Sequence, residues 1–366
     1  MKRNILAVVI PALLATSVVN AAEIYNKDGN KLNLYGNVAG LHYFSKDRKE
    51  EGAKSYAYLG FKGETQITDQ LAGYGQWEYS LETNPLQSLA SKSDKTRLGL
   101  VGLKFADYGS LDYGRGYGIL YNVKSWTTSL PEFGSDIAYS STDNLMSSRA
   151  NGVTTYRNNN FFGLIDGLNF ALQYQGKNVI KKRDLEEQNG EGWGISSIYN
   201  AGEGISVGAA YVASQRTEAQ KTSDADIGRN KAEAWTLGTK YDANNIYLAV
   251  MYAENRNIPP FGKSFYVNGI SSKTYNFGMT AQYQFDFGLR PAVSYMQAKS
   301  KHINTTDTRN KQDLIKYVSI GSTYAFNKNM STYVDYKINL LSNNQYTKIT
   351  EVTADNIVAL GLLYQF

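Results

Sequence analysis

Hydrophobic and polar residues alternate along most of this chain, and the alternation has the period of a β-strand. The segment 273–286 is the clearest example, because apolar side chains occupy every second position and polar ones fill the positions between them. Segments 55–68 and 330–341 repeat this pattern, as do 31–44 and the C-terminal 357–366. Successive side chains of a strand point to opposite faces, so each segment predicts a strand with one apolar and one polar face.

The connections between the predicted strands alternate in length. Seven are short, at 68–70, 106–109, 158–167, 200–204, 242–245, 286–288 and 327–329. Eight are long and polar, near 45–54, 82–95, 121–148, 177–191, 217–230, 256–272, 299–312 and 341–355. Fifteen connections join sixteen strands, and a meander with short turns at one end and long loops at the other is typical of outer-membrane barrels.

The placement of charge favours a membrane barrel over a soluble sandwich. In three of these strands the charged side chains after strand entry all lie on the polar face: Lys62, Glu64, Asp286, Asp335 and Lys337. A charge on a lipid face costs about 2–4 kcal/mol near the midplane. The sequence therefore predicts an all-β fold, a 16-stranded antiparallel transmembrane β-barrel with a polar interior. Its last strand should pair with the first and leave no free edge.

The N-terminal 21 residues have the pattern of an export signal. Lys2 and Arg3 precede an apolar run from Ile5, and small residues lead to Ala21. This pattern predicts a cleaved signal peptide at 1–21 and a barrel at 22–366. The chain has no cysteine, so disulfides do not stabilise it.

Composition excludes several other classes of function. The net charge of +5 is small for 366 residues, and no basic run with interleaved aromatic residues predicts nucleic-acid binding. The only histidines are His42 and His302, and no metal-ligand spacing or G-x-S-x-G pattern occurs. We therefore expect no enzyme activity, no cofactor and no metal. The 29 tyrosines suit a membrane interface, because tyrosine has an apolar body and a polar tip.

Several stretches make the family resemblance specific. They include "AEIYNKDGNKLNLYG", "LGFKGETQI", "KTRL", "LPEFG", "TYRN", "FFGLIDGLNF", "QYQFDFGLRP", "FNKNMSTYVDY" and the final "YQF". Over the whole of 22–366 the chain resembles the general trimeric porins of Gram-negative outer membranes, of the outer-membrane protein C, F and phosphoporin type. The resemblance implies a homotrimer in which each barrel holds a water-filled pore. It also implies contact with outer-membrane lipid and lipopolysaccharide, and assembly by the barrel-assembly machinery, which recognises the terminal Phe366.

The resemblance further implies that the third long extracellular loop folds into the barrel and narrows it. Glu132 corresponds to the family's loop glutamate, and the loop-shaping positions correspond to Pro131, Phe133, Gly134 and Asp136. On the opposite wall, Arg97 and Arg149 correspond to two family arginines. Three positions depart from the family pattern: Asn37 replaces a lysine, Tyr58 an arginine and Thr128 an aspartate.

Charges in a narrow throat bias which ions enter it, and opposed rows of charge align the water between them. With Arg97 and Arg149 opposite Glu132, both rows contain fewer charged residues than in the family pattern. We therefore expect passive diffusion of small hydrophilic solutes and ions with weak ion selectivity. The alternative is a substrate-specific porin for an oligosaccharide or a phosphate compound, in which Tyr58 and Trp126 could form a stacking track.

Overall fold

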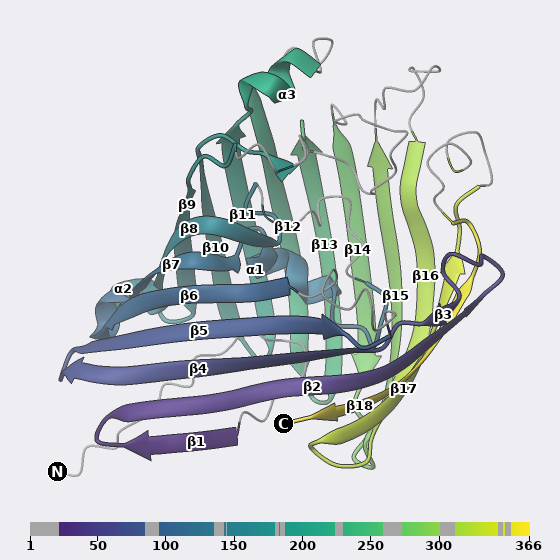
Figure 1. The fold of residues 1–366 in the computed structure, drawn as a ribbon, viewed down its shortest axis with the longest axis horizontal. Helices are drawn as coiled ribbons and strands as arrows, with labels where there is room; N and C mark the ends of the chain where they lie inside the picture. The colour runs from purple at the N-terminus through teal and green to yellow at the C-terminus, as the bar shows by residue number, and fades with distance from the viewer. Residues whose placement is uncertain are drawn as a thin grey trace.

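The computed structural model describes residues 22–84, 95–134, 143, 145–179, 183, 187–223, 230–258, 273–300, 312–342, 347 and 353–366. Sixteen of its strands form a closed antiparallel ring, from β2 through β4 and each later strand in order to β18, which pairs again with β2. This closed barrel, drawn in Figure 1, confirms the predicted fold class. The predicted signal peptide at 1–21 lies outside the described residues.

The sixteen strands of the ring run from 8 to 16 residues. Their bounds are β2 Asn30–Ser45, β4 Tyr56–Thr68, β5 Leu71–Glu82, β6 Lys95–Phe105, β7 Ser110–Tyr117, β8 Arg149–Asn158, β9 Leu168–Gln175, β10 Gly192–Gly202, β11 Ile205–Gln215, β12 Lys231–Ala243, β13 Ile246–Arg256, β14 Thr274–Tyr283, β15 Leu289–Ser300, β16 Gln312–Ala325, β17 Met330–Asn339 and β18 Ile357–Gln365.

Two further short strands were not predicted. The strand β3 (Gly52–Ala53) pairs with β2 inside the first long connection. The strand β1 (Ala22–Lys27) forms a hairpin with the first residues of β2, while β18 pairs with the remainder of β2. The backbones of Phe366 and Gly36 exchange hydrogen bonds of 3.0 and 3.1 Å where the two segments meet. The two ends of the described chain thus share one neighbouring strand, and together they close the barrel.

Burial alternates along the strands as the sequence predicts. On β13, Leu248, Val250 and Tyr252 point outward and are 39–45% exposed, whereas the intervening Tyr247, Ala249 and Met251 are at most 4% exposed. The same alternation places Asp335 inside and Val334 outside on β17. Eleven residues at about 3.4 Å each extend about 37 Å, which at the tilt of a barrel strand is sufficient to cross a bilayer.

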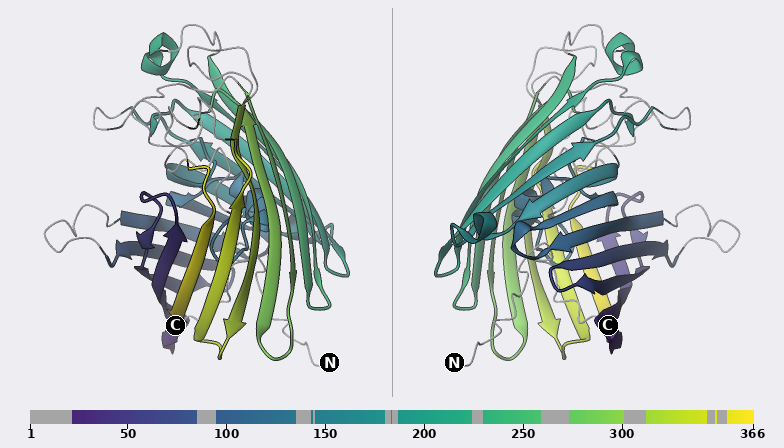
Figure 2. Two further views of the ribbon diagram at one scale, coloured as in Figure 1. Left: turned by 90° about the vertical axis from the view of Figure 1, so that its right-hand side faces the viewer. Right: turned by 90° about the vertical axis from the view of Figure 1, so that its left-hand side faces the viewer.

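All seven predicted short turns join consecutive strands at one end of the barrel, and the long connections join them at the other. Figure 2 shows the C-terminus at the end with the short turns. The helical segments are brief: η2 (Ala106–Tyr108), α1 (Tyr121–Lys124), η3 (Ser125–Thr127), α2 (Asn160–Gly163) and α3 (Glu218–Ser223). None of the helices in the described chain is sufficiently long and apolar to span a membrane, a finding that does not bear on strands.

Candidate functional site

Residues 118–134 of the third long connection lie inside the barrel. Its helical turns α1 and η3 contact the inner face of the wall, and Figure 1 draws α1 within the ring. Val123 and Trp126 pack against β11 and β12 at Gly208 and Gly238, which belong to the inward-pointing set of side-chain positions. The segment therefore covers the inner side of the wall that β10–β14 form.

Glycines on the wall permit this close approach. A Cβ atom added at Gly238 would lie 2.7 Å from Val123 Cγ1, and one at Gly208 would lie 2.7 Å from a ring carbon of Trp126. At Gly278 on β14 the nearest atom would be Thr127 Oγ1 at 2.9 Å. Real Cβ atoms do not approach other heavy atoms this closely, so any side chain at these positions would displace the loop.

Hydrogen bonds hold the loop to the wall along its length. The Tyr247 hydroxyl donates to the Trp126 carbonyl at 2.7 Å, and the Gln282 amide donates to the Ser129 carbonyl at 2.6 Å. The Tyr121 ring stacks on Tyr117 with centroids 4.3 Å apart. Burial raises the pKa of Tyr121, so its phenol stays neutral and adds no charge.

A buried carboxylate on β17 fixes the loop tip. Asp335 Oδ2 accepts the backbone N–H groups of Glu132 and Phe133 at 3.2 and 3.1 Å, and Oδ1 accepts the Ser319 hydroxyl. Asp335 has no exposed surface. Buried backbone N–H groups need a hydrogen-bond acceptor, and this loop lies away from any regular β-ladder that would supply one. The Asp335 carboxylate satisfies two of these N–H groups.

The Glu132 side chain is held by two tyrosines from the strands on either side of the closing strand. The Tyr43 hydroxyl on β2 donates to Oε1 at 2.5 Å, and the Tyr333 hydroxyl on β17 donates to Oε2 at 2.9 Å. Phe133 packs against Tyr43 at 5.6 Å between ring centroids, and the Lys337 ammonium lies 5.4 Å from the Phe133 ring. The loop glutamate therefore has a fixed position.

Arg97, one of the two predicted wall arginines, lies on a part of the wall that the loop leaves uncovered. Arg97 on β6 forms an ion pair with Glu78 on β5, and its guanidinium lies 5.3 Å from the Tyr58 ring centroid on β4. The Tyr35 hydroxyl also donates to Glu78, at 3.1 Å, and the Lys62 ammonium lies 5.3 Å from the Tyr35 ring. Arg97 is the extra residue of a β-bulge, since Glu78 pairs with Leu98 and Tyr79 with Thr96. A bulge redirects a side chain in this way.

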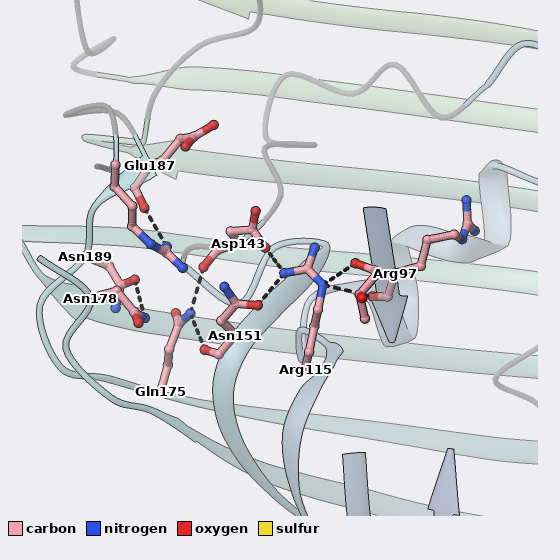
Figure 3. A network of polar contacts seen from close by, with 10 residues as sticks. Arg97, Arg115, Asp143, Asn151, Gln175, Asn178, Glu187 and Asn189 are labelled. Carbon is pink, nitrogen blue, oxygen red and sulfur yellow. Dashed lines mark hydrogen bonds and ion pairs between the residues drawn. The ribbon is translucent and has the colours of Figure 1, made fainter. Parts of the chain in front are cut away.

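A second arginine at an irregularity, Arg115 of β7, begins a polar network that leads away from this wall (Figure 3). Its Nε donates to the Thr96 and Arg97 carbonyls at 2.9 and 3.1 Å, and its Nη1 contacts Asp143 and Asn151. The Gln175 amide then joins the Asp143 and Asn151 carbonyls, both at 3.2 Å.

The structure brings most of the predicted residues to this region. Arg149 begins β8, close enough to Arg97, Arg115 and Glu78 for their charges to act on it. Its guanidinium makes no hydrogen bond or ion pair with any residue in the described ranges. Asn37 points inward beside Tyr58 but is only 6% exposed.

The predicted loop residues occupy different environments. Thr128 Oγ1 donates to the Ser125 carbonyl at 3.1 Å and closes the turn η3, whereas Pro131 is half-buried at the loop tip. Gly134 has a φ of +131°, a backbone conformation that favours glycine. Asp136 lies outside the described residues.

The site predicted from the sequence did not include Glu78, Arg115, Tyr43, Tyr333 and Asp335. Alternation places Asp335 and Tyr333 on the inner face, and that signal identified their side of the strand. It did not identify their partners, because those come from a loop far away in sequence. Glu78 and Arg115 depend on the two strand irregularities, for which the sequence gives no signal. Within the described chain, no three metal-ligating residues cluster.

Comparisons with known proteins agree with this architecture. A family model described as Gram-negative porin matches residues 27–366. The chain is 64% identical to outer membrane protein F of Serratia marcescens and 56% identical to outer membrane porin N of Escherichia coli, with all of each chain covered. Among solved structures, OmpF of Salmonella typhi in complex with daunomycin superposes with a TM-score of 0.86 at 45% identity, over 94% of this chain and 100% of that one.

Proposed function

Because the chain belongs to the Gram-negative porin family, we propose that its loop segment 118–134 and the uncovered wall together form the constriction that selects solutes. The protein is a passive outer-membrane channel for small hydrophilic solutes, as its relatives are. Members of the family are channels without enzymatic activity, so the prediction of no enzyme is confirmed.

The observation that carries the constriction proposal is the double attachment of Glu132. Its carboxylate is bound by Tyr43 and Tyr333, while Arg97 and Arg149 lie on the uncovered wall of β6 and β8. The Tyr56 side chain on β4 lies close enough to both Glu132 and Arg97 to interact electrostatically with them. Tyr56 is therefore near both a positive residue of the wall and the negative residue of the loop, and opposed charges in a narrow throat produce a transverse field.

We propose that this pore has weak ion selectivity, because most of the charge on the wall is internally balanced. Glu78 neutralises Arg97, and Asp143 neutralises Arg115. Arg149 lies near Arg97, Arg115 and Glu78, and the charge of Glu132 is dispersed by two hydroxyl donors. With Tyr58, Asn37 and Thr128 uncharged, neither sign dominates the throat.

Reversal potentials across a planar bilayer under a potassium chloride gradient test this proposal. We expect a small reversal potential for the unmodified protein, and a shift toward anion preference for Glu132→Gln. Tyr333→Phe should also change the selectivity, because it frees one carboxylate oxygen of Glu132. Tyr336→Phe is the matched control, since Tyr336 lies on the outer face of the same strand. A strongly cation-selective channel, or equal effects of the two tyrosine substitutions, would refute the assignment.

The alternative of a substrate-specific porin for an oligosaccharide or a phosphate compound receives less support. Trp126 is 4% exposed and packs against Gly208 and Gly238 of the wall, so it offers no open ring face. Tyr58 alone remains, under the Arg97 guanidinium. Liposome swelling with sugars of increasing size separates the two: a general pore gives a smooth size cutoff, and a specific one saturates with its substrate.

We also propose that the chain forms a homotrimer surrounded by outer-membrane lipid and lipopolysaccharide, and that the barrel-assembly machinery recognises Phe366. The position of Phe366 supports this role, because its backbone pairs with Gly36 where the barrel closes. Deleting Phe366 should lower the amount of protein in the outer membrane, and light scattering of the detergent-purified protein should give the mass of three chains. A monomer, or full assembly without Phe366, would contradict these assignments.

A further inference from the structure

The turn between β8 and β9 has an unusual backbone. Four consecutive residues have left-handed φ angles: 54° at Asn160, 44° at Phe161, 61° at Phe162 and 77° at Gly163. This conformation is unfavourable for residues with a Cβ atom, which approaches the following carbonyl oxygen. Such strain persists only where the surrounding structure enforces it, and it often marks a functional feature.

Asparagine side chains enforce this conformation. Asn158 Oδ1 accepts the Phe162 N–H at 2.6 Å, and Asn160 Oδ1 accepts the Gly167 N–H at 3.0 Å. Asn169 Oδ1 accepts the Asn160 N–H at 3.3 Å from the start of β9. Both ends and the middle of the turn are thereby fixed, so the side chains that it carries have set positions.

This turn carries apolar side chains that are exposed. Leu164 is 77% exposed, the highest value among the large hydrophobic residues of the described chain, and Ile165 is 45% exposed. Phe161 and Phe162 are 38% and 42% exposed. In water, this turn would have two free-energy costs, the backbone strain and the exposure of four large apolar side chains. An apolar surrounding removes the cost of exposing the apolar side chains.

The apolar surface of the turn is continuous with the outer face of the barrel. The Phe161 and Phe162 rings lie 5.7 and 5.6 Å from the Phe170 ring of β9, and the Tyr156 ring of β8 lies 5.9 Å from it. Phe170 belongs to the outward set of β9, whose next outward residue Leu172 is 44% exposed. Figure 1 shows α2 at the end of the barrel with the short turns, which is the periplasmic end in barrels of this kind.

We propose that residues 160–165 form an anchor that inserts Phe161, Phe162, Leu164 and Ile165 into the periplasmic leaflet of the outer membrane, where phospholipid acyl chains cover them. The Tyr156 hydroxyl donates to the Tyr108 carbonyl in the neighbouring short turn, so its polar tip is directed toward the same end of the barrel. The anchor rests on the barrel's location in the membrane and not on the constriction.

The absence of cysteine from the chain makes a direct test possible. Leu164→Cys is labelled with a nitroxide in the full-length protein, reconstituted into phospholipid vesicles, and its spin relaxation is measured with oxygen and with a water-soluble nickel complex. Oxygen concentrates in lipid and the nickel complex in water. Asp69→Cys, in the exposed turn between β4 and β5, is the matched control. Both labelled proteins must conduct as the unlabelled protein does.

The proposal predicts that oxygen relaxes the label at 164 more strongly than nickel does, and that the order reverses at 69. If nickel dominates at 164 as well, the turn lies in the aqueous periplasm and the proposal is wrong. If neither reagent reaches the label at 164, another protein chain covers the turn, which also overturns the proposal. Because conductance is measured on the same samples, a failure of the anchor is distinguishable from a failure of the channel.

Discussion

Replacing Asp335 by alanine should free the loop tip from the wall. The substitution removes the acceptor for the N–H groups of Glu132 and Phe133 and for the Ser319 hydroxyl, all at a position without exposed surface. A hydrogen bond to a charged group contributes about 1.5–3 kcal/mol. The Ser319 hydroxyl can rotate to another acceptor, so the two hydrogen bonds from the backbone account for most of the free energy lost.

Two such bonds contribute about 3–6 kcal/mol. Both use the same carboxylate oxygen, so their contributions are not additive and the lower value applies. A loss of about 3 kcal/mol changes the equilibrium between attached and detached loop tip about 100-fold. The bonds from Tyr247 and Gln282 remain, so the loop should stay inside the barrel while its tip moves.

Single-channel recording in a planar bilayer measures this motion. Asp335→Ala should give a noisier open current with closures at lower voltage than the unmodified protein. Asp335→Asn is the matched control, because its carbonyl oxygen can accept both N–H groups and its amide can donate to Ser319. It should remain close to the unmodified protein. An Asp335→Ala channel with a steady current at every voltage would refute the role of this carboxylate.

Two further substitutions test other parts of the site. Glu78→Gln leaves Arg97 without its carboxylate partner, so the reversal potential in a salt gradient should shift toward anion preference; no shift would mean that Arg97 does not act on permeating ions. Gly238→Val places side-chain atoms within 2.7 Å of Val123, so the loop must move and the single-channel conductance should change. Gly63→Ala, whose added Cβ meets nothing closer than 3.9 Å, is its control, and an equal conductance for both would contradict the packing argument.

The sequence predicted the barrel closely because the bilayer imposes a regular pattern on every strand. The first and last strands, expected at 31–44 and 357–366, are observed at Asn30–Ser45 and Ile357–Gln365. The strand β1 was missed, since it has six exposed residues and pairs only with the start of β2. No alternation marks a strand that has no buried face.

The site was predicted less completely, and the reason is geometric. The positions of Glu132, Arg97 and Arg149 came from family resemblance, while their neighbours depend on strand register and loop placement. The ion pair between Arg97 and Glu78 requires a bulge that shifts the register by one residue. The bonds of Tyr43 and Tyr333 to Glu132 join residues about 90 and 200 positions apart, and a sequence pattern carries no information at that distance.

Passive diffusion through this protein requires a water-filled interior within a wall that faces lipid. Conductance of the purified protein in a planar bilayer, measured over a series of salt concentrations, tests this most directly. A water-filled trimer predicts three equal current steps whose size rises in proportion to the conductivity of the bathing solution. A protein that stays dissolved as a monomer without detergent and adds no current to the bilayer would contradict it.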